Sequence, residues 1–427
     1  MTSRPRSARP PALRYRPARR TDVETLVDLS LRAYRVSSAE ARRDFYTDHP
    51  RFGIRDVRVG ELDGEIVASL VLPPFVAWVR TQRVPVTGIG SVAVSPEHRR
   101  RGVADALVRA CLRELRQRGD ALCMLYAFRG EFYRRFGWGL VERAHLVSVH
   151  PATLPASDES RRVRRLRMPD RPLVQELYER HAQQRGHFAF ARRPEWWEKR
   201  LWTYEGDWVV YERRRGQIEG YAQYQVDAGE GPWKLVVTVN EFVAQTPEAH
   251  RGLVGYLHAM RDQAIEIALA VPNDAVWATE MRDAQNLRGE MKLGGLRSDG
   301  HGATGAHLRL VDVKAALEAL PVNANARGEI VLDVRDDVLP QNTREWRVSA
   351  RDGKLNVRAE NARSAASRTK LPRLALDVAT LASIVAGTLS PVRAAETGMA
   401  DDVRGAAEVV EPWFRARPVF VHLMNGF

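Results

Sequence analysis

One short order of residues occurs twice in this chain, about 150 residues apart, and it limits the folds that the chain can adopt. Each copy runs from an apolar strand through Pro-Glu and a basic residue before glycine into a helix, at Ser95–Gly102 and at Thr246–Leu253. A repeat at this spacing indicates two copies of one domain. The 427 residues leave room for roughly two to four domains, so a further part is expected.

The first copy alternates strands and helices in the order of a mixed α+β layer. Thr21 is placed to cap the first helix, because a threonine hydroxyl can accept from the free N–H groups at a helix start. Gly88 and Gly90 interrupt a strand at 84–95, which indicates a bulge or the close approach of another backbone or a ligand. The other expected elements are strands at 13–16, 121–128 and 139–149, a hairpin at 57–62 and 65–72, a helix from Val103 to a C-cap at Gly119, and a short helix at 130–136.

A linker at 151–160 leads to the second copy, and the order of elements changes after Asp312. The second copy is predicted to contain strands at 163–168, 207–213, 218–226 and 233–239, and helices at 171–185 and from 246 to about 269. The third part is predicted to contain a helix at 312–319, strands at 328–335, 344–350 and 353–359, a polar loop at 361–370, and helices at 376–389 and 400–411. The chain ends in an apolar, aromatic segment, whereas most termini are polar, so we expect this end to be packed.

The net charge of +13 is concentrated outside the expected domains. Residues 1–20 carry many arginines and prolines and no acid, which is typical of a flexible basic tail. The charge is interpreted as favouring solubility and weak polyanion affinity, because no zinc-finger spacing or RNA-binding aromatic motif accompanies it. The two cysteines, Cys111 and Cys123, cannot form a metal cluster or a disulfide framework. We therefore expect buried, inert thiols, no metal and a cytoplasmic location.

The loop Arg99–Ala104 joins an apolar strand to an amphipathic helix and carries the strongest chemical signal. A helix start offers free N–H groups and the positive end of the helix dipole, Gly102 allows a close approach, and the arginines add charge. This combination suits an anion such as a pyrophosphate. A solvated basic loop with a glycine at the helix start remains the alternative.

The pattern resembles the GNAT superfamily of acyl-CoA N-acyltransferases, whose signature is Arg/Gln-x-x-Gly-x-Gly/Ala. The longer match is to the Eis (enhanced intracellular survival) family, and it rests on Val92–Gly102, Gly130–Gly139 and the aromatic C-terminus. That resemblance implies two GNAT domains, a sterol-carrier-protein-like domain and a homo-hexamer. The implied divisions are a tail at 1–13, an acetyl-CoA-binding GNAT domain at 14–150, a degenerate GNAT domain at 161–311 and the sterol-carrier-like domain at 312–427.

The resemblance also assigns roles to particular residues. It implies that Tyr133 is the general acid and that the terminal carboxylate of Phe427 is the general base. It places the pantetheine arm, the pyrophosphate and the thioester of acetyl-CoA, in that order, at these residues: Val92, Ala93 and Val94; Arg100, Arg101, Gly102, Val103, Ala104 and Asp105; Phe128 and Arg129.

These two roles suit the chemistry of acyl transfer to an amine. A base must remove a proton from the attacking amine, and an acid must protonate the departing thiolate. A tyrosine, with a reference pKa of about 10, can supply the second proton, and burial would raise the low pKa of an α-carboxylate. The structural alternatives are that Tyr133 is a core aromatic residue and that Phe427 only plugs a groove.

Several residues depart from the family pattern. In the second repeat, Ala249 replaces the first arginine of the signature and Val254 replaces its final small residue, so this domain is not expected to bind CoA. Gly426 stands where the family can carry an acid, which weakens the case for polycationic acceptors. Four tryptophans could line a pocket for a cationic amine, although core packing is the more ordinary role for them: Trp196, Trp197, Trp202 and Trp208.

We therefore expect an α+β, acetyl-CoA-dependent N-acetyltransferase that modifies primary amines of aminoglycoside, polyamine or lysine type by direct attack. A non-catalytic protein that binds a lipid through the sterol-carrier-like domain, or nucleic acid through the basic tail, is the competing hypothesis. A third hypothesis keeps the enzyme and changes the acyl group to propionyl or longer.

Overall fold

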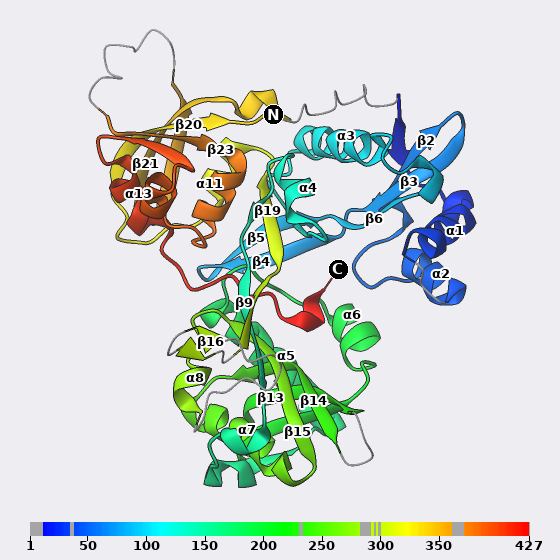
Figure 1. The fold of residues 1–427 in the computed structure, drawn as a ribbon, viewed down its shortest axis with the longest axis vertical. Coiled ribbons are helices and arrows are strands. Elements are labelled where there is room, and N and C mark those ends of the chain that lie inside the picture. Colours follow the sequence, from blue (N-terminus) through cyan, green and yellow to red (C-terminus); the bar gives the residue numbers. More distant parts are fainter. Residues whose placement is uncertain are drawn as a thin grey trace.

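A computed structural model describes residues 12–34, 38–229, 234–281, 292–293, 296–297, 300–360 and 371–426. The architecture is α+β, as expected, and has three parts that lie side by side (Figure 1). The basic tail up to residue 11, the polar loop at 361–370 and Phe427 lie outside the described residues. No helix within the described ranges is long and apolar enough to cross a membrane.

The first part holds two sheets. The four-stranded sheet has the order β1 (Arg14–Pro17), β2 (Val57–Leu62), β3 (Glu65–Val71) and β6 (Gly90–Val94). The six-stranded sheet has the order β11 (Ala189–Phe190), β4 (Pro74–Val79), β5 (Gln82–Gly88), β7 (Leu122–Tyr126), β19 (Ala306–Leu310) and β8 (Gly139–Leu140). The helices are α1 (Val23–Tyr34), α2 (Ala39–Thr47), α3 (Val103–Arg118) and α4 (Gly130–Arg134).

The amphipathic helix α3 forms where the sequence predicts it and buries one apolar face. Gly119 ends α3 in a left-handed conformation, with φ of 81°, which a glycine adopts without steric strain because it has no Cβ. Cys111 lies on this buried face and Cys123 lies within β7, and both are free and buried, as expected for core thiols. Thr21, in contrast, does not cap α1, because it lies inside a short 3-10 turn in which the Asp22 carboxylate accepts from the Arg19 N–H at 2.7 Å.

The second part is a seven-stranded sheet with the order β10 (Val163–Arg165), β12 (Asp207–Arg214), β13 (Gln217–Ala228), β14 (Leu235–Ala244), β15 (Ala264–Pro272), β9 (Arg143–Val149) and β18 (Gly300–Thr304). Its helices are α5 (Arg171–Arg185), α6 (Pro194–Trp196), α7 (Pro247–His258) and α8 (Trp277–Glu280), and β16 (Lys292–Leu293) pairs with β17 (Leu296–Arg297). The helix expected to reach about residue 269 is wrong, because α7 ends at His258 and residues 264–272 form strand β15. The sequence of β15 is an apolar run without a helical period, because its buried residues largely alternate along the strand. Such a run does not by itself distinguish a strand from a helix.

The first two parts exchange strands. The single strand predicted at 139–149 is two strands, since β8 pairs with β19 while β9 pairs with β15 and β18. In the other direction, β19 follows the second part in sequence but pairs with β7 of the first. Each sheet is therefore completed by a strand from beyond the expected linker, so the two parts share one hydrogen-bonded framework.

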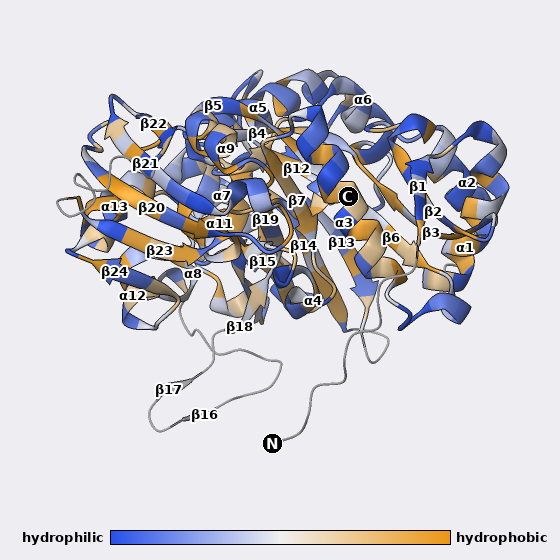
Figure 2. Ribbon diagram, turned by 90° about the horizontal axis from the view of Figure 1, so that it is seen from above, coloured by the Kyte–Doolittle hydropathy of each residue, from blue (hydrophilic) through white to orange (hydrophobic). Residues whose placement is uncertain are grey.

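The third part is a five-stranded sheet with the order β22 (Lys354–Ala359), β21 (Arg344–Arg351), β20 (Gly328–Arg335), β23 (Arg373–Asp377) and β24 (Ala400–Val403). Its helices are α9 (Val313–Ala319), α11 (Val378–Val385), α12 (Pro391–Glu396) and α13 (Ala406–Phe414), and the apolar positions of β20 and β23 colour orange beside them (Figure 2). The helix predicted at 400–411 is corrected to strand β24 followed by α13, and the one at 376–389 is shorter and preceded by β23.

The last residues leave the third part and return to the rest of the molecule. In Figure 1 the red C-terminal segment crosses toward the middle of the molecule and ends in a short turn, Leu423–Asn425, beside α6. Val419, Val421, Met424 and Asn425 are all buried. The prediction that this apolar end is packed is therefore confirmed for these four residues, whereas Leu423 is 55% exposed.

Candidate active site

The strands β6 and β7 diverge, and the gap between them starts directly after Ile89, where β5 ends and β6 begins. The chain of β5 runs parallel to β7 through the pairs Thr87–Cys123 and Gly88–Met124, and the Ile89 N–H donates to the Met124 carbonyl at 2.8 Å. After that contact, β6 pairs, among the strands of the described residues, only with β3, in the other sheet. The register of β6 shifts beside Ser91, whose φ is 50°, so a bulge marks the start of the divergence. One edge of β6 is therefore left without a strand partner.

The backbone groups on this edge follow from the antiparallel register. Ser95 donates to Val67 at 2.8 Å, so the next hydrogen-bonded pair in the ladder is Ala93 with Ser69. Val92 and Val94 consequently direct their N–H and C=O groups toward the open edge. Of the three residues expected along a pantetheine arm, Val92 and Val94 have backbone N–H and C=O groups available at the open edge. The backbone groups of Ala93 instead face Ser69 of β3.

The loop before α3 has the geometry of an anion cradle. Arg100 and Gly102 both adopt left-handed backbone conformations, with φ of 60° and 80°, and Gly102 is the N-cap of α3. The first intrahelical bond in α3 runs from Ala106 N–H to the Gly102 carbonyl at 3.0 Å. The N–H groups of Val103, Ala104 and Asp105 therefore precede any helical acceptor and stand free at the positive end of a 16-residue helix. Geometry of this kind suits an anion such as a pyrophosphate.

Asp105 lies in this first turn, and its charge is compensated. The Arg109 Nε donates to its carboxylate at 2.7 Å, and an Arg135 Nη lies 3.5 Å from the second oxygen. The backbone N–H of Asp105 can therefore donate to an anion, whereas its carboxylate interacts with Arg109 and Arg135. The side chains of Arg100 and Arg101 are exposed and add positive charge to the loop.

An aromatic group borders the end of β7. Phe128 leaves 75% of its surface exposed, while Tyr133 on α4 is only 3% exposed. The Tyr133 ring meets Phe132 and Trp138 edge-on, with centroids 4.9 and 5.8 Å away, and Phe128 at 6.1 Å. Burial raises the pKa of Tyr133, so its hydroxyl stays protonated at neutral pH. Arg129, exposed, directly precedes α4 as its N-cap.

The buried carboxylate of Glu142 ties the C-terminal segment to this strand end. It accepts from the Val421 N–H at 2.5 Å and from the Ala306 N–H at 2.9 Å, and it also bonds the hydroxyl of Tyr126, the last residue of β7. Burial raises the pKa of Glu142. Neither Glu142 nor Tyr126 belongs to a recognisable motif, so the sequence analysis missed both.

The C-terminal turn is held by side chains from both of the first two parts. The Asn425 amide donates to the Tyr178 hydroxyl at 2.9 Å and accepts from Arg192 Nε at 2.8 Å. Arg51, from the loop after α2, donates to the Asn425 carbonyl at 2.8 Å. Arg192 in turn forms a fully buried, bidentate pair with Glu241 at 2.7 and 3.0 Å. Arg51, Tyr178 and Arg192 thus hold the C-terminal turn in place.

The four tryptophans are core residues. Trp196, Trp197 and Trp208 are 2%, 3% and 8% exposed, and they pack in one apolar cluster with the partly buried Trp202. Arg51 and Arg192 already lie over the rings of Trp196 and Trp197, at 3.2 and 4.8 Å from the ring centroids. The Trp196 and Trp197 rings therefore already contact cationic side chains of the chain itself.

The second repeat does not reproduce the anion cradle. The helix α7 starts at Pro247, so Gly252 lies inside it instead of at its N-cap. A Cβ on Gly252 would come within 2.5 Å of the Tyr211 ring, which shows that this glycine allows close packing of the helix on β12. Among the residues that the structure describes, no three metal-ligating side chains cluster.

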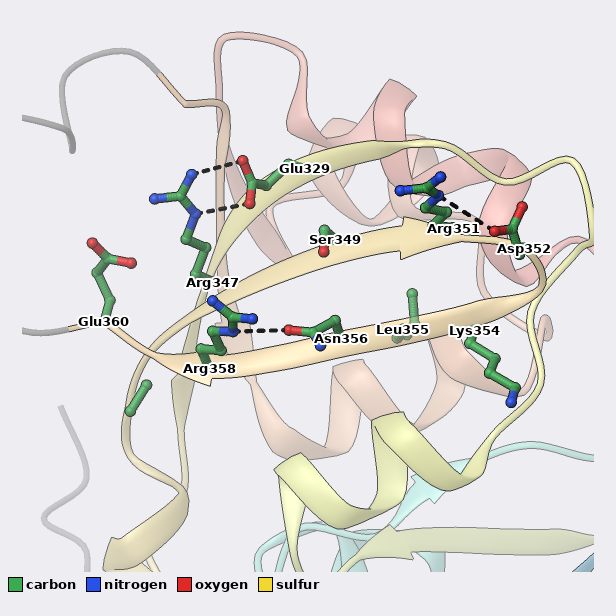
Figure 3. Close-up of a pocket in the computed structure, with 11 residues that line it drawn as sticks. Glu329, Arg347, Ser349, Arg351, Asp352, Lys354, Leu355, Asn356, Arg358 and Glu360 are labelled. Atoms are coloured by element: carbon green, nitrogen blue, oxygen red, sulfur yellow. Dashed lines mark hydrogen bonds and ion pairs between the residues drawn. The ribbon is translucent and has the colours of Figure 1, made fainter.

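A large open groove lies elsewhere, on the outer face of β20, β21 and β22 (Figure 3). Its volume is about 940 Å³, and charged side chains of both signs line it, among them the bidentate pair of Arg347 with Glu329. The opposite face of this sheet is filled by the apolar core, including Trp346, Leu374 and Trp413.

Family models cover most of the chain. An acetyltransferase (GNAT) domain model matches residues 14–141, a second acetyltransferase (GNAT) domain model matches 189–298, and a sterol carrier protein domain model matches 313–421. The chain is 27% identical over 383 residues to an uncharacterized N-acetyltransferase of Streptomyces coelicolor, with 84% of this chain and 88% of the relative covered.

Two further matches bear the Eis name. The chain is 36% identical over 66 residues, 16% of each protein, to the N-acetyltransferase Eis of Mycobacterium tuberculosis. The crystal structure of Eis1 from Mycobacterium abscessus superposes with a TM-score of 0.74 at 22% identity, covering 98% of this chain and all of that one, which shows a shared fold.

Proposed function

We propose that this chain, which belongs to the Eis family of GNAT N-acetyltransferases and is an acyltransferase, moves an acetyl group from acetyl-CoA to a primary amine in the gap between β6 and β7. The observation that carries the proposal is the open edge of Val92 and Val94 beside the N-terminus of α3. The edge supplies backbone partners for the amides of a pantetheine arm. The free N–H groups of the helix and the arginines of the loop supply partners for the pyrophosphate.

Acetyl-CoA supplies the activated acyl group, and the chain's own residues handle the protons. An amine must lose its proton to attack, and we assign that step to the α-carboxylate of Phe427, acting directly or through a water. We assign the protonation of the leaving sulfur to Tyr133. Its raised pKa suits this role, because an acid must still hold its proton at neutral pH in order to donate it. Phe128 and Arg129 would border the thioester at the end of β7.

The acceptor is proposed to be a primary amine of aminoglycoside, polyamine or lysine type. Gly426 carries no charge, and the nearby acids Glu142 and Glu241 are each bound by chain groups. Attraction of a polycation would therefore depend on groups outside these pairs. A panel of aminoglycosides, polyamines, lysine-rich peptides and arylamines, assayed by acetyl-CoA-dependent thiol release, tests the proposal and ranks the acceptor classes.

Three finer assignments follow the family resemblance. We propose a homo-hexamer, testable by sedimentation, and a cytoplasmic location, which the two free thiols suit. We propose acetyl in preference to propionyl or longer acyl groups, testable with the corresponding acyl-CoA series.

A sterol carrier protein domain model matches the third part, but the packing of its described residues does not favour the competing lipid-binding function. The inner face of the β20–β23 sheet is packed with the third part's own apolar side chains, and the open groove on the outer face is polar. A lipid that co-purifies in stoichiometric amount would nevertheless revive that function. The basic tail proposed for nucleic acid lies outside the described residues.

A further inference from the structure

The second part contains a cavity at the point where two of its parallel strands diverge. β14 and β15 pair up to Val239 with Leu269, and beyond this pair β14 continues beside β13 while β15 continues beside β9. The cavity lies in this split, has a volume of about 400 Å³, and is lined by Phe242 and Ala244 of β14 and by Ala270 of β15. Protein pockets of roughly 300–1,000 Å³ hold small molecules, so this cavity is large enough for a ligand.

The edge of β14 that faces the split offers backbone groups to a ligand. The Gln245 N–H donates to the Glu219 carbonyl at 2.8 Å, and hydrogen-bonded pairs alternate with non-hydrogen-bonded pairs along an antiparallel ladder. Phe242 and Ala244 therefore direct their N–H and C=O groups away from β13 and toward the cavity.

The helix that follows β14 sets this cavity apart from the gap in the first part. The Thr246 hydroxyl accepts from the Ala249 N–H at 3.2 Å, so the chain itself caps the start of α7. Gly252 lies inside that helix, and the described residues form no diphosphate cradle at its start. The cavity therefore suits a ligand without a diphosphate.

Three rings form one wall of the cavity. Phe242, His250 and Trp277 meet edge-on, with centroids 5.5, 5.7 and 6.0 Å apart. Phe420, from the C-terminal segment, lines the cavity as well. Aromatic rings favour edge-on and offset contacts with other rings, so this lining favours an aromatic ligand.

The charges at the cavity favour an anion. Arg185, at the end of α5, and Arg417, in the C-terminal segment, both line the cavity and are exposed. Asp274 is exposed there too, so these three charges sum to a positive value. Glu241 adds no net charge, because it forms a buried ion pair with Arg192. A positively charged cavity attracts a negatively charged ligand.

His181 adds a hydrogen-bonding group to the cavity. It lies one helical turn before Arg185, so the two side chains share a face of α5. Burial lowers the pKa of His181 to about 3, and the charges of Arg185 and Arg417 act in the same direction. The ring is therefore neutral at neutral pH, and its buried Nδ1 has no hydrogen-bond partner within the described part of the chain. A ligand in the cavity can supply that partner.

We propose that this cavity binds a small aromatic carboxylate. The carboxylate pairs with Arg185 and Arg417, since guanidinium groups match the geometry of carboxylate oxygens, and the aromatic ring packs against Phe242 and Trp277. The inference does not rest on the proposed function, because Val92, Val94 and the loop before α3 do not line this cavity.

Isothermal titration calorimetry of the full-length protein with phenylacetate tests the site. We expect one molecule bound per chain with a dissociation constant below about 1 mM. Acetate lacks the ring and benzyl alcohol lacks the charge, so each should bind at least tenfold more weakly. No binding of phenylacetate up to about 10 mM, or equal binding of all three probes, would overturn the proposal.

A matched pair of variants tests the contribution of the charge. Arg417→Gln should raise the dissociation constant of phenylacetate at least tenfold, because it removes a charged hydrogen-bond donor from the cavity. Arg415 is also exposed on the C-terminal segment and does not line the cavity, so Arg415→Gln should leave the affinity unchanged. Equal effects of the two variants would contradict a carboxylate site at Arg417.

The same titration with CoA present locates the bound ligand. Saturating CoA should leave the affinity for phenylacetate unchanged, because the residues proposed for CoA lie in the first part. Displacement of phenylacetate by CoA would place it in the first gap and overturn this proposal. The titration needs no acyl transfer, so a failure of the proposed function would not alter its result.

Discussion

The hydroxyl of Tyr34 donates a hydrogen bond of 2.6 Å to the carbonyl oxygen of Val92, on the open edge of β6. That carbonyl is one of the groups that a pantetheine amide would use. Binding of CoA therefore competes with a bond formed by the protein itself. The side chain of Tyr34 is 44% exposed, so it can turn to water when the bond is broken.

This competition predicts that Tyr34→Phe binds CoA more tightly. A neutral hydrogen bond contributes about 1 kcal/mol, which corresponds to roughly a fivefold lower dissociation constant. Isothermal titration calorimetry with CoA measures the effect directly. A weaker affinity in Tyr34→Phe would instead show that the hydroxyl contacts CoA.

The position of Gly102 at the start of α3 predicts that a bulky side chain there would block anion binding by the loop. Replacement by valine adds a branched side chain at φ of 80°, beside the free N–H groups of α3, and should raise the dissociation constant of CoA by at least tenfold. Gly119→Val is the matched control, because Gly119 has φ of 81° and its Cβ would meet open space. Both variants carry the same backbone strain, so equal losses of CoA affinity would contradict an anion site at Gly102.

Tyr133 predicts a defined effect on turnover and on its pH dependence. Tyr133→Phe should lower kcat by about 100-fold and leave CoA binding unchanged, because general acid catalysis typically contributes 100-fold or more. Its pKa is raised by burial, so the acid form persists through neutral pH and kcat of the wild type should not fall on the alkaline side before pH 10. A loss of kcat near pH 8 would assign the acid to another group.

The pair of Arg192 with Glu241 predicts a large contribution to stability. Glu241→Gln leaves a buried guanidinium without its counter-ion and should destabilise the fold by about 3–5 kcal/mol in chemical denaturation. Glu329→Gln, which breaks the more exposed pair with Arg347, should change stability by about 1 kcal/mol or less. Similar effects of the two variants would contradict the role assigned to the buried pair.

Glu241 also predicts how stability changes with pH. Burial by itself would raise its pKa, but the charge of Arg192 lowers it below the ordinary value. A carboxylate with a depressed folded-state pKa contributes stability above its unfolded pKa of about 4.3 and loses it as pH falls further. The difference in unfolding free energy between the wild type and Glu241→Gln should thus be constant above pH 5 and shrink below pH 4.

Local elements could be predicted from the sequence because their signals are local. The apolar face of α3, the turn between β2 and β3, and the C-cap at Gly119 each depend on residues within one element. The exchange of β9 and β19 could not be predicted, since neither strand carries a mark of its partner. The prediction of a helix at β15 failed for a different reason, because a short apolar run does not by itself distinguish a buried strand from a helix.

The candidate site divides in the same way. The loop Arg99–Ala104 and Tyr133 lie in continuous motifs, so the resemblance could propose roles for them. Arg51 and Asn425 are 374 positions apart, and Glu142 is 279 positions from Val421, so no spacing rule could bring these residues together. Their association depends on the return of the C-terminal segment, which only the structure shows.

Acetyl-CoA-dependent thiol release, measured against the mixed amine panel with wild type and Gly102→Val in parallel, tests the central claim most directly. We predict turnover of at least one primary amine by the wild type, with a raised KM for acetyl-CoA in the variant. Tight binding of acetyl-CoA without turnover of any amine would contradict the proposed amine acetylation at this site.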